Sequence, residues 1–83
     1  SMKIGQIVYS KAGRDKGYAL AVIAISPKGI FAVDGKKRPL ERPKFKNLKH
    51  LVVTDYCLKG EEYRSNKALR SSLKGYQSKN DEF

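Results

Sequence analysis

The sequence has few of the residues with which small proteins usually form covalent cross-links, metal sites or catalytic centres. It contains a single cysteine, Cys57, so an internal disulfide is excluded. Cys57 and His50 are the only soft metal ligands, which excludes a cysteine-rich zinc site, and we expect no metal and no cofactor. A chain without disulfides suits a reducing compartment, so we expect a cytoplasmic protein.

Long apolar runs are also absent. No segment approaches the roughly 18 apolar residues of a membrane span, and the N-terminus lacks the apolar stretch of a signal peptide. We therefore expect no membrane as a partner. The 83 residues allow one small domain. A domain of this size buries only about 60% of the surface that its unfolded chain exposes, which leaves little room for a deep substrate pocket.

Acidic residues are scarce, with eight Asp and Glu against eighteen Lys and Arg, so the net charge is +10. Residues 1–53 hold twelve of the cations and three of the acids, whereas residues 54–83 are nearly neutral. The densest stretch, residues 36–50, has seven cations and one acid, Glu41. Such an excess indicates a polyanionic ligand: RNA, DNA or a membrane surface. A face that serves only solubility is the alternative, but solubility is usually achieved with mixed signs.

Five short segments have the character of β-strands and are separated by turn residues. The longest, residues 18–25, is apolar throughout, so both of its faces must be covered, and Tyr18 and Phe31 are assigned to the core. Asp34-Gly35 indicates a turn, and Pro39 with Pro43 restricts the fourth segment to a short or edge strand. This pattern predicts a mainly β fold, a small barrel of about five strands. The segments are residues 4–9, 18–25, 30–33, 38–45 and 48–53.

A C-terminal helix is predicted to cover the outer face of the barrel. Ser65 or Asn66 can cap its start, and Leu69, Leu73 and Tyr76 recur on one face. A glycine at position 75 is a plausible end, although one more turn is possible. The expected organisation is a barrel over residues 1–55, a linker and packed helix over residues 56–76, and a flexible tail over residues 77–83.

The residues do not form a recognisable catalytic constellation. His50 lies in a lysine-rich stretch, and a structural role suits it better than that of a catalytic base. The acids show no paired spacing of carboxylates. The loop from Gly13 to Gly17 is no phosphate-binding P-loop, because a strand follows it instead of a helix. We therefore expect the protein not to be an enzyme.

The loop between the first two predicted strands is the most informative segment. Gly13 and Gly17 allow positive φ angles and close approach of a ligand to the backbone, although they can equally serve a turn alone. Arg14 and Lys16 are placed at its tip, where Arg14 can grip a phosphate with two donors or stack on a base. Asp15 either orients Arg14 or shapes the turn.

This strand–glycine loop–strand segment resembles the KOW motif, in which a Lys-Gly pair closes the loop, as Lys16-Gly17 does here. The usual motif has a further glycine where this chain has Leu20. Over residues 3–76 the order of motifs also resembles the KOW protein of archaeal and eukaryotic large ribosomal subunits, of the fourteenth type. The residues that carry this resemblance are Gly5, Val8, Gly13, Gly17, Val33-Asp34-Gly35, Arg38, Leu48 and Thr54-Asp55.

The resemblance implies an SH3-like barrel that binds ribosomal RNA as a ribosomal or ribosome-associated protein in translation. The alternative is a KOW module for protein interaction, as in transcription elongation, which binds an acidic protein. Ribosomal proteins are further possible partners, and we expect the free protein to be a monomer.

The candidate RNA-binding residues fall into two basic clusters, and whether these lie side by side is left open. Phosphate contacts would dominate the affinity, and recognition would follow RNA shape more than sequence. Phe45 is either a base-stacking residue or an anchor into the barrel. The candidate residues are Lys11, Arg14, Lys16, Lys36, Lys37, Arg38, Arg42, Lys44, Lys46 and Lys49, with Gly13, Gly17 and Gly35 setting the loop geometry.

Overall fold

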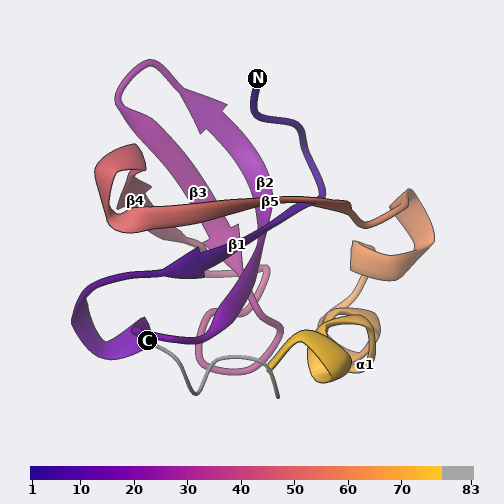
Figure 1. Cartoon of the computed structure of the whole chain (residues 1–83). Helices are drawn as coiled ribbons and strands as arrows, with labels where there is room; N and C mark the ends of the chain where they lie inside the picture. Colours follow the sequence, from indigo (N-terminus) through magenta and orange to yellow (C-terminus); the bar gives the residue numbers. More distant parts are fainter. Residues whose placement is uncertain (78–83) are drawn as a thin grey trace.

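The computed structural model describes residues 1–77, which form one five-stranded antiparallel sheet followed by one α-helix (Figure 1). The predicted fold class, a small mainly β barrel-like domain with a C-terminal helix, is confirmed. The strands are β1 (Gln6–Ser10), β2 (Ala19–Ser26), β3 (Gly29–Val33), β4 (Lys44–Asn47) and β5 (Leu51–Cys57), and the helix is α1 (Asn66–Gln77). Short 3-10 turns occupy Gly13–Asp15, Leu48–His50 and Gly60–Tyr63.

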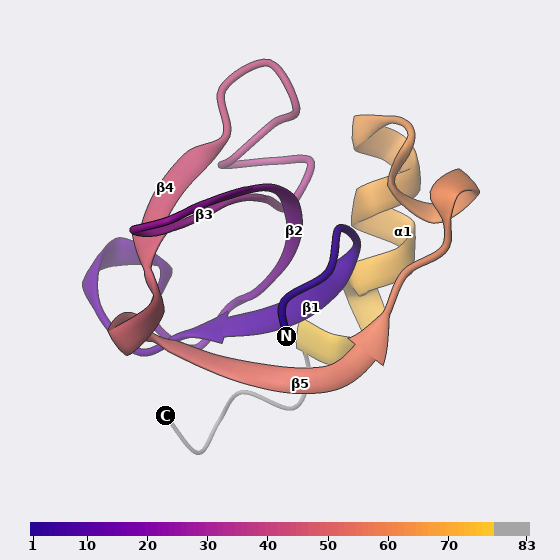
Figure 2. The same cartoon turned by 90° about the horizontal axis from the view of Figure 1, so that it is seen from above.

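The strands lie in the order β4-β3-β2-β1-β5, so β1 to β4 form a meander and β5 returns to pair with β1. A bulge in β2 between Val22 and Ala24 and another irregularity in β1 increase the bending of the sheet. Figure 2 shows the strands curling around a common interior, with α1 outside them beside β1 and β2.

The predicted covering of both faces of the second strand is confirmed for its first half, residues 19–22, whereas Tyr18 and Ile25 at the ends of the predicted segment are 45% and 48% exposed. Leu20 and Val22 point into the barrel, where they pack with Val8 and Ile30. Ala19 and Ala21 face the opposite way and belong to a second buried cluster with Leu69 and Leu73 of α1. Because successive strand residues alternate between faces, a strand buried on both sides has no polar positions left.

The helix begins where the sequence predicts. The Ser65 hydroxyl accepts a hydrogen bond from the Ala68 N–H at 3.0 Å, as an N-cap residue does. Leu69 and Leu73 are buried against the sheet, and Tyr76 is partly buried beside them. The apolar stripe of α1 is therefore the cover of the outer face.

The helix extends through Gly75 to Gln77, one residue into the predicted tail. The Gln77 side-chain amide explains this extension, because it accepts from the Ala19 N–H and donates to the Ala19 carbonyl, both at 2.9 Å. The barrel and helix thus exchange a pair of hydrogen bonds. The rest of the predicted flexible tail, residues 78–83, lies outside the described residues.

The first three predicted strands differ from the structure by one or two residues at their ends, whereas the fourth and fifth differ more. Asp34-Gly35 does not form a tight hairpin but opens a longer loop that runs to Pro43, so β4 begins at Lys44. Both prolines of the fourth segment fall in this loop, since proline cannot donate to a strand ladder. The fifth segment begins as a 3-10 turn, and the strand after it continues to Cys57.

Candidate functional site

The loop between β1 and β2 adopts the geometry that its glycines were predicted to allow. Gly13 has φ +76° and Gly17 has φ +85°, both in the left-handed region. The 3-10 turn closes with a hydrogen bond from the Lys16 N–H to the Gly13 carbonyl at 3.2 Å. Gly17 then donates to the Ser10 carbonyl at 2.8 Å, which returns the chain to the sheet. Arg14 and Lys16 are exposed on this turn.

The loop between β3 and β4 is organised by Asp34. Its Oδ1 atom accepts from the backbone N–H groups of Lys36 and Arg38, each at 2.8 Å, as aspartate often does in turns. Gly35 takes φ +81° and is buried against α1, where a Cβ would collide with the Asn66 carbonyl. Lys36 and Lys37 are exposed at the top of the loop.

A buried carboxylate connects the two loops. Asp15 is only 1% exposed, and its Oδ2 atom lies 2.8 Å from Lys46 Nζ and 3.2 Å from Arg38 Nη2. Lys46 also donates to the Ser10 hydroxyl at 3.4 Å. We refer to Asp15, Arg38 and Lys46 as the ion triad. It fixes the β1–β2 loop to the β3–β4 loop and to β4.

The ion triad corrects part of the predicted binding set. Lys46, expected to contact RNA, is 8% exposed and directs its ammonium to Asp15. Arg38 is partly buried and uses its guanidinium on the same carboxylate. Asp15 therefore neither orients Arg14 nor merely shapes the turn. The reason is electrostatic: a carboxylate removed from water needs cations as partners, and these two are the ones within reach.

The two predicted basic clusters lie side by side, as the ion triad and two further contacts show. Lys37 Nζ lies 4.7 Å from the centre of the Tyr18 ring, which follows the first loop. The backbone N–H of Lys11 donates to the His50 carbonyl at 2.7 Å, which joins the 3-10 turn of residues 48–50 to that loop. Three segments that carry exposed cations therefore adjoin: the β1–β2 loop, the β3–β4 loop and the turn of residues 48–50. We call these cations the loop surface: Lys11, Arg14, Lys16, Lys36, Lys37 and Lys49.

Two further predicted residues are not joined to the β1–β2 loop by a contact of their own within the described part of the chain, and we leave them out of the loop surface. Arg42 and Lys44 are exposed at the end of the β3–β4 loop and at the start of β4. Among residues 1–77, no hydrogen bond, ion pair or ring contact connects either of them to the β1–β2 loop. They extend the basic character along β4.

The aromatic residues are arranged differently from the prediction. Tyr18, assigned to the core, is 45% exposed because it precedes β2 and packs under Lys37 instead of inside the barrel. Phe31, also assigned to the core, is only partly buried. Phe45 does not anchor into the interior but meets Phe31 edge to face, with 5.4 Å between ring centres. More than a third of Phe45 remains exposed.

The described residues contain no cluster of three or more His, Cys, Asp or Glu side chains that could hold a metal ion. No helix within residues 1–77 is both long enough and apolar enough to cross a membrane. Compared with models of known protein families and with curated proteins, the chain matches none.

The pKa of Asp15 gives a test of the ion triad. Burial alone would raise this pKa, but the hydrogen bonds and charges of Lys46 and Arg38 outweigh burial and hold it below the usual 3.8. Ionised Asp15 therefore stabilises the fold above pH 3.8, and this stabilisation is lost as the pH falls through the folded-state pKa. We expect the Asp15 carboxyl carbon, followed by NMR from pH 7 downwards, to titrate with a midpoint below 3.8. A midpoint at or above that value would contradict the ion pairs.

Proposed function

We propose that the protein binds RNA, and ribosomal RNA in particular, through the loop surface. The observation that carries this proposal is that three segments bearing exposed cations adjoin. Asp15 joins the β1–β2 loop to the β3–β4 loop through Arg38, Lys37 contacts the Tyr18 ring, and the backbone of Lys11 bonds to that of His50. Surface charges that serve only solubility have no need of such a buried link. The order of KOW-type motifs in the sequence supports RNA as the polyanion and a role at the ribosome in the cytoplasm.

The proposed mechanism is electrostatic positioning of the RNA backbone. Each Lys or Arg that neutralises a phosphate releases a condensed counterion, so affinity falls steeply with salt. Arg14 can hold one phosphate with two parallel donors, whereas Lys16 acts as a point charge. Because Gly13 and Gly17 have no side chain, a phosphate can come close to the backbone of this loop. Such contacts follow the shape of the RNA and do not read its bases.

The test is the affinity for structured ribosomal RNA fragments, measured across a salt series. We expect the double variant Arg14→Ala, Lys16→Ala to bind more weakly and to lower the slope of log affinity against log salt by about 2, since two phosphate contacts are lost. The matched control is Lys3→Ala with Lys28→Ala, which removes two exposed charges outside the loop surface.

Three outcomes decide this test. A reduced slope in the loop variant alone supports the proposal. A wild-type protein that fails to bind at low salt, or whose binding does not respond to salt, contradicts it. Equal losses in both double variants would mean that binding depends on net charge and not on the loop surface.

A second candidate function is the docking of an acidic protein. The net charge of +10 favours an acidic partner, and the edge strand β5, on which Val53 and Tyr56 are about half exposed, offers apolar contacts to a protein. RNA binding by the loop surface gives these side chains no role. An acidic protein that remains bound to the chain after RNase treatment, together with absence of RNA binding, would favour this function.

A further inference from the structure

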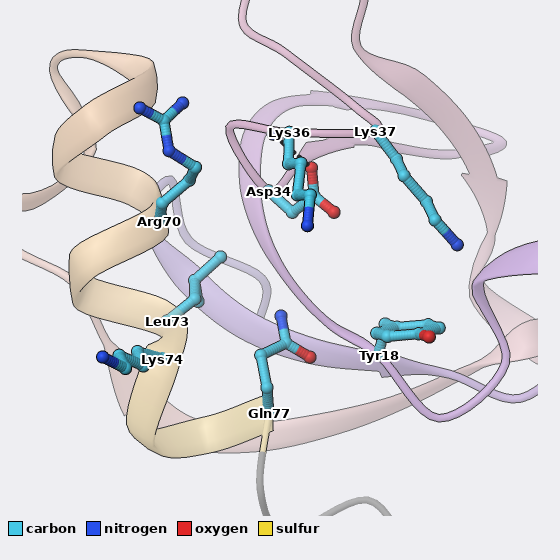
Figure 3. Close-up of a pocket in the computed structure, with 8 residues that line it drawn as sticks. All are labelled: Tyr18, Asp34, Lys36, Lys37, Arg70, Leu73, Lys74 and Gln77. Carbon is cyan, nitrogen blue, oxygen red and sulfur yellow. Dashed lines mark hydrogen bonds between the residues drawn. The ribbon is translucent and has the colours of Figure 1, made fainter.

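A hollow of about 360 Å³ lies between α1 and the β3–β4 loop. Figure 3 shows Tyr18 and Gln77 at one end of it, Arg70 at the other and Lys36 between them, while Lys74 turns away. Leu73 forms an apolar part of the wall. The volume is within the range of ligand sites, roughly 300–1,000 Å³. The hollow is also continuous with the loop surface, because Lys36 and Lys37 belong to both.

The charge around this hollow is strongly positive. Lys36, Lys37, Arg70 and Lys74 line it together with a single acid, Asp34. One oxygen of that carboxylate is occupied, because Asp34 Oδ1 accepts from two backbone N–H groups of its own loop. The four cations outweigh the one carboxylate, so the lining favours an anion, and a low-dielectric wall such as Leu73 strengthens the attraction.

Two contacts hold the cations in place before any ligand arrives. The ammonium of Lys37 lies over the Tyr18 ring at 4.7 Å from its centre, a cation–π contact that restricts a long flexible side chain. Arg70 Nη1 donates to the Gly35 carbonyl at 2.8 Å. This is the one hydrogen bond of the Arg70 side chain within residues 1–77, so its other N–H groups are available to a ligand. A site whose donors are already positioned loses less entropy on binding.

We propose that this hollow binds backbone phosphates of the RNA, with Arg70 at one end, Lys37 at the other and Lys36 between them as the donors, and with Tyr18 as a positioning residue for Lys37. The inference rests on the proposed function and deepens it. It assigns α1 a role that the sequence did not indicate, because the nearly neutral C-terminal part of the chain was expected only to pack. The helix then contributes one guanidinium to the RNA interface.

The first test compares Arg70→Gln with Lys67→Gln, which removes an exposed charge from the same helix outside the hollow. We expect Arg70→Gln to lower the salt slope for RNA by about 1 and the affinity about five-fold at physiological salt, the effect of one phosphate contact. Lys67→Gln should bind as the wild type does. Unchanged dispersion of the NMR spectrum without RNA would show that Arg70→Gln is still folded.

A second variant leaves the bond between Arg70 and Gly35 untouched. Tyr18→Leu removes the ring that positions Lys37 and should weaken RNA binding by roughly two- to five-fold, the range for an exposed cation–π contact. Tyr18→Phe keeps the ring face and should restore wild-type affinity. A loss in Tyr18→Phe equal to that in Tyr18→Leu would contradict the positioning role.

Titration of the free wild-type protein with inorganic phosphate locates the site directly. We expect the backbone amide signals of Lys36 and Lys37 and the side-chain N–H signal of Arg70 to shift more than the Lys28 amide. If the wild type binds no RNA, the proposed function fails, and the assignment of an RNA phosphate fails with it. If the wild type binds RNA while Arg70→Gln and Tyr18→Leu bind like Lys67→Gln, only the role of the hollow is overturned.

Discussion

Replacing Asp15 by alanine is expected to lower the free energy of unfolding by about 3–5 kcal/mol, the usual cost of removing one partner from a buried ion pair. Asp15 is fully buried, and the Lys46 ammonium, 2.8 Å away, is almost as inaccessible. Without the carboxylate, Lys46 is left with the Ser10 hydroxyl at 3.4 Å as its one described partner. A small domain has only about 5–15 kcal/mol of stability in total, so this loss is large.

Urea unfolding of the single and double variants checks this expectation. Asp55→Ala is the matched control, because Asp55 is exposed on β5 and its loss should change stability by no more than about 0.5 kcal/mol. Adding Lys46→Met to Asp15→Ala removes the unpaired charge and should recover much of the stability. An Asp15→Ala protein as stable as Asp55→Ala would show that the ion triad contributes little to the fold.

The barrel and its covering helix were predictable because they depend on local patterns. Residues 19–25 of β2 are all apolar, which suits burial on both faces, and the first half of the strand is buried in this way. The stripe of Leu69 and Leu73 supplies the cover at helical spacing. Both inferences use the spacing of apolar residues within one segment, which can be seen without knowing what packs against that segment.

The ion triad was not predictable, because its members lie far apart in the sequence and their pairing depends on how the meander bends. Asp15, between Arg14 and Lys16, looks like one more loop charge. Lys46 looks like an exposed lysine of a basic stretch, and nothing local marks it as inward-pointing. A weak signal exists, since Asp15 is the single acid of a strongly basic loop, but its partners follow only from the tertiary structure.

The hollow beside α1 escaped prediction for a related reason. Arg70 lies outside the apolar stripe of Leu69 and Leu73, and it is exposed, as helical periodicity leads one to expect. Periodicity does not show which part of the chain packs next to Arg70 in the folded protein. Gly35 approaches α1 so closely that no side chain would fit between them, and this contact brings the β3–β4 loop next to Arg70.

Truncation of Leu69 to alanine is expected to destabilise the protein by about 2–5 kcal/mol, the range for a fully buried leucine. Leu69 is fully buried and belongs to the cluster that joins α1 to β1 and β2. Its Cβ atom also lies against Gly35, so it supports the β3–β4 loop as well as the helix. The substitution leaves a cavity in the small cluster between α1 and the sheet, which has few other side chains to fill it.

The matched control is Leu48→Ala, the same chemical change at a leucine that is 50% exposed in the 3-10 turn before β5. Its effect should be small, because little transfer free energy and no cavity are involved. Urea midpoints at constant m-value separate the two variants. If Leu69→Ala were as mild as Leu48→Ala, the helix would not be an integral layer of the fold. The cations of the β3–β4 loop would then depend for their position on Asp34, the ion triad and the Tyr18 ring.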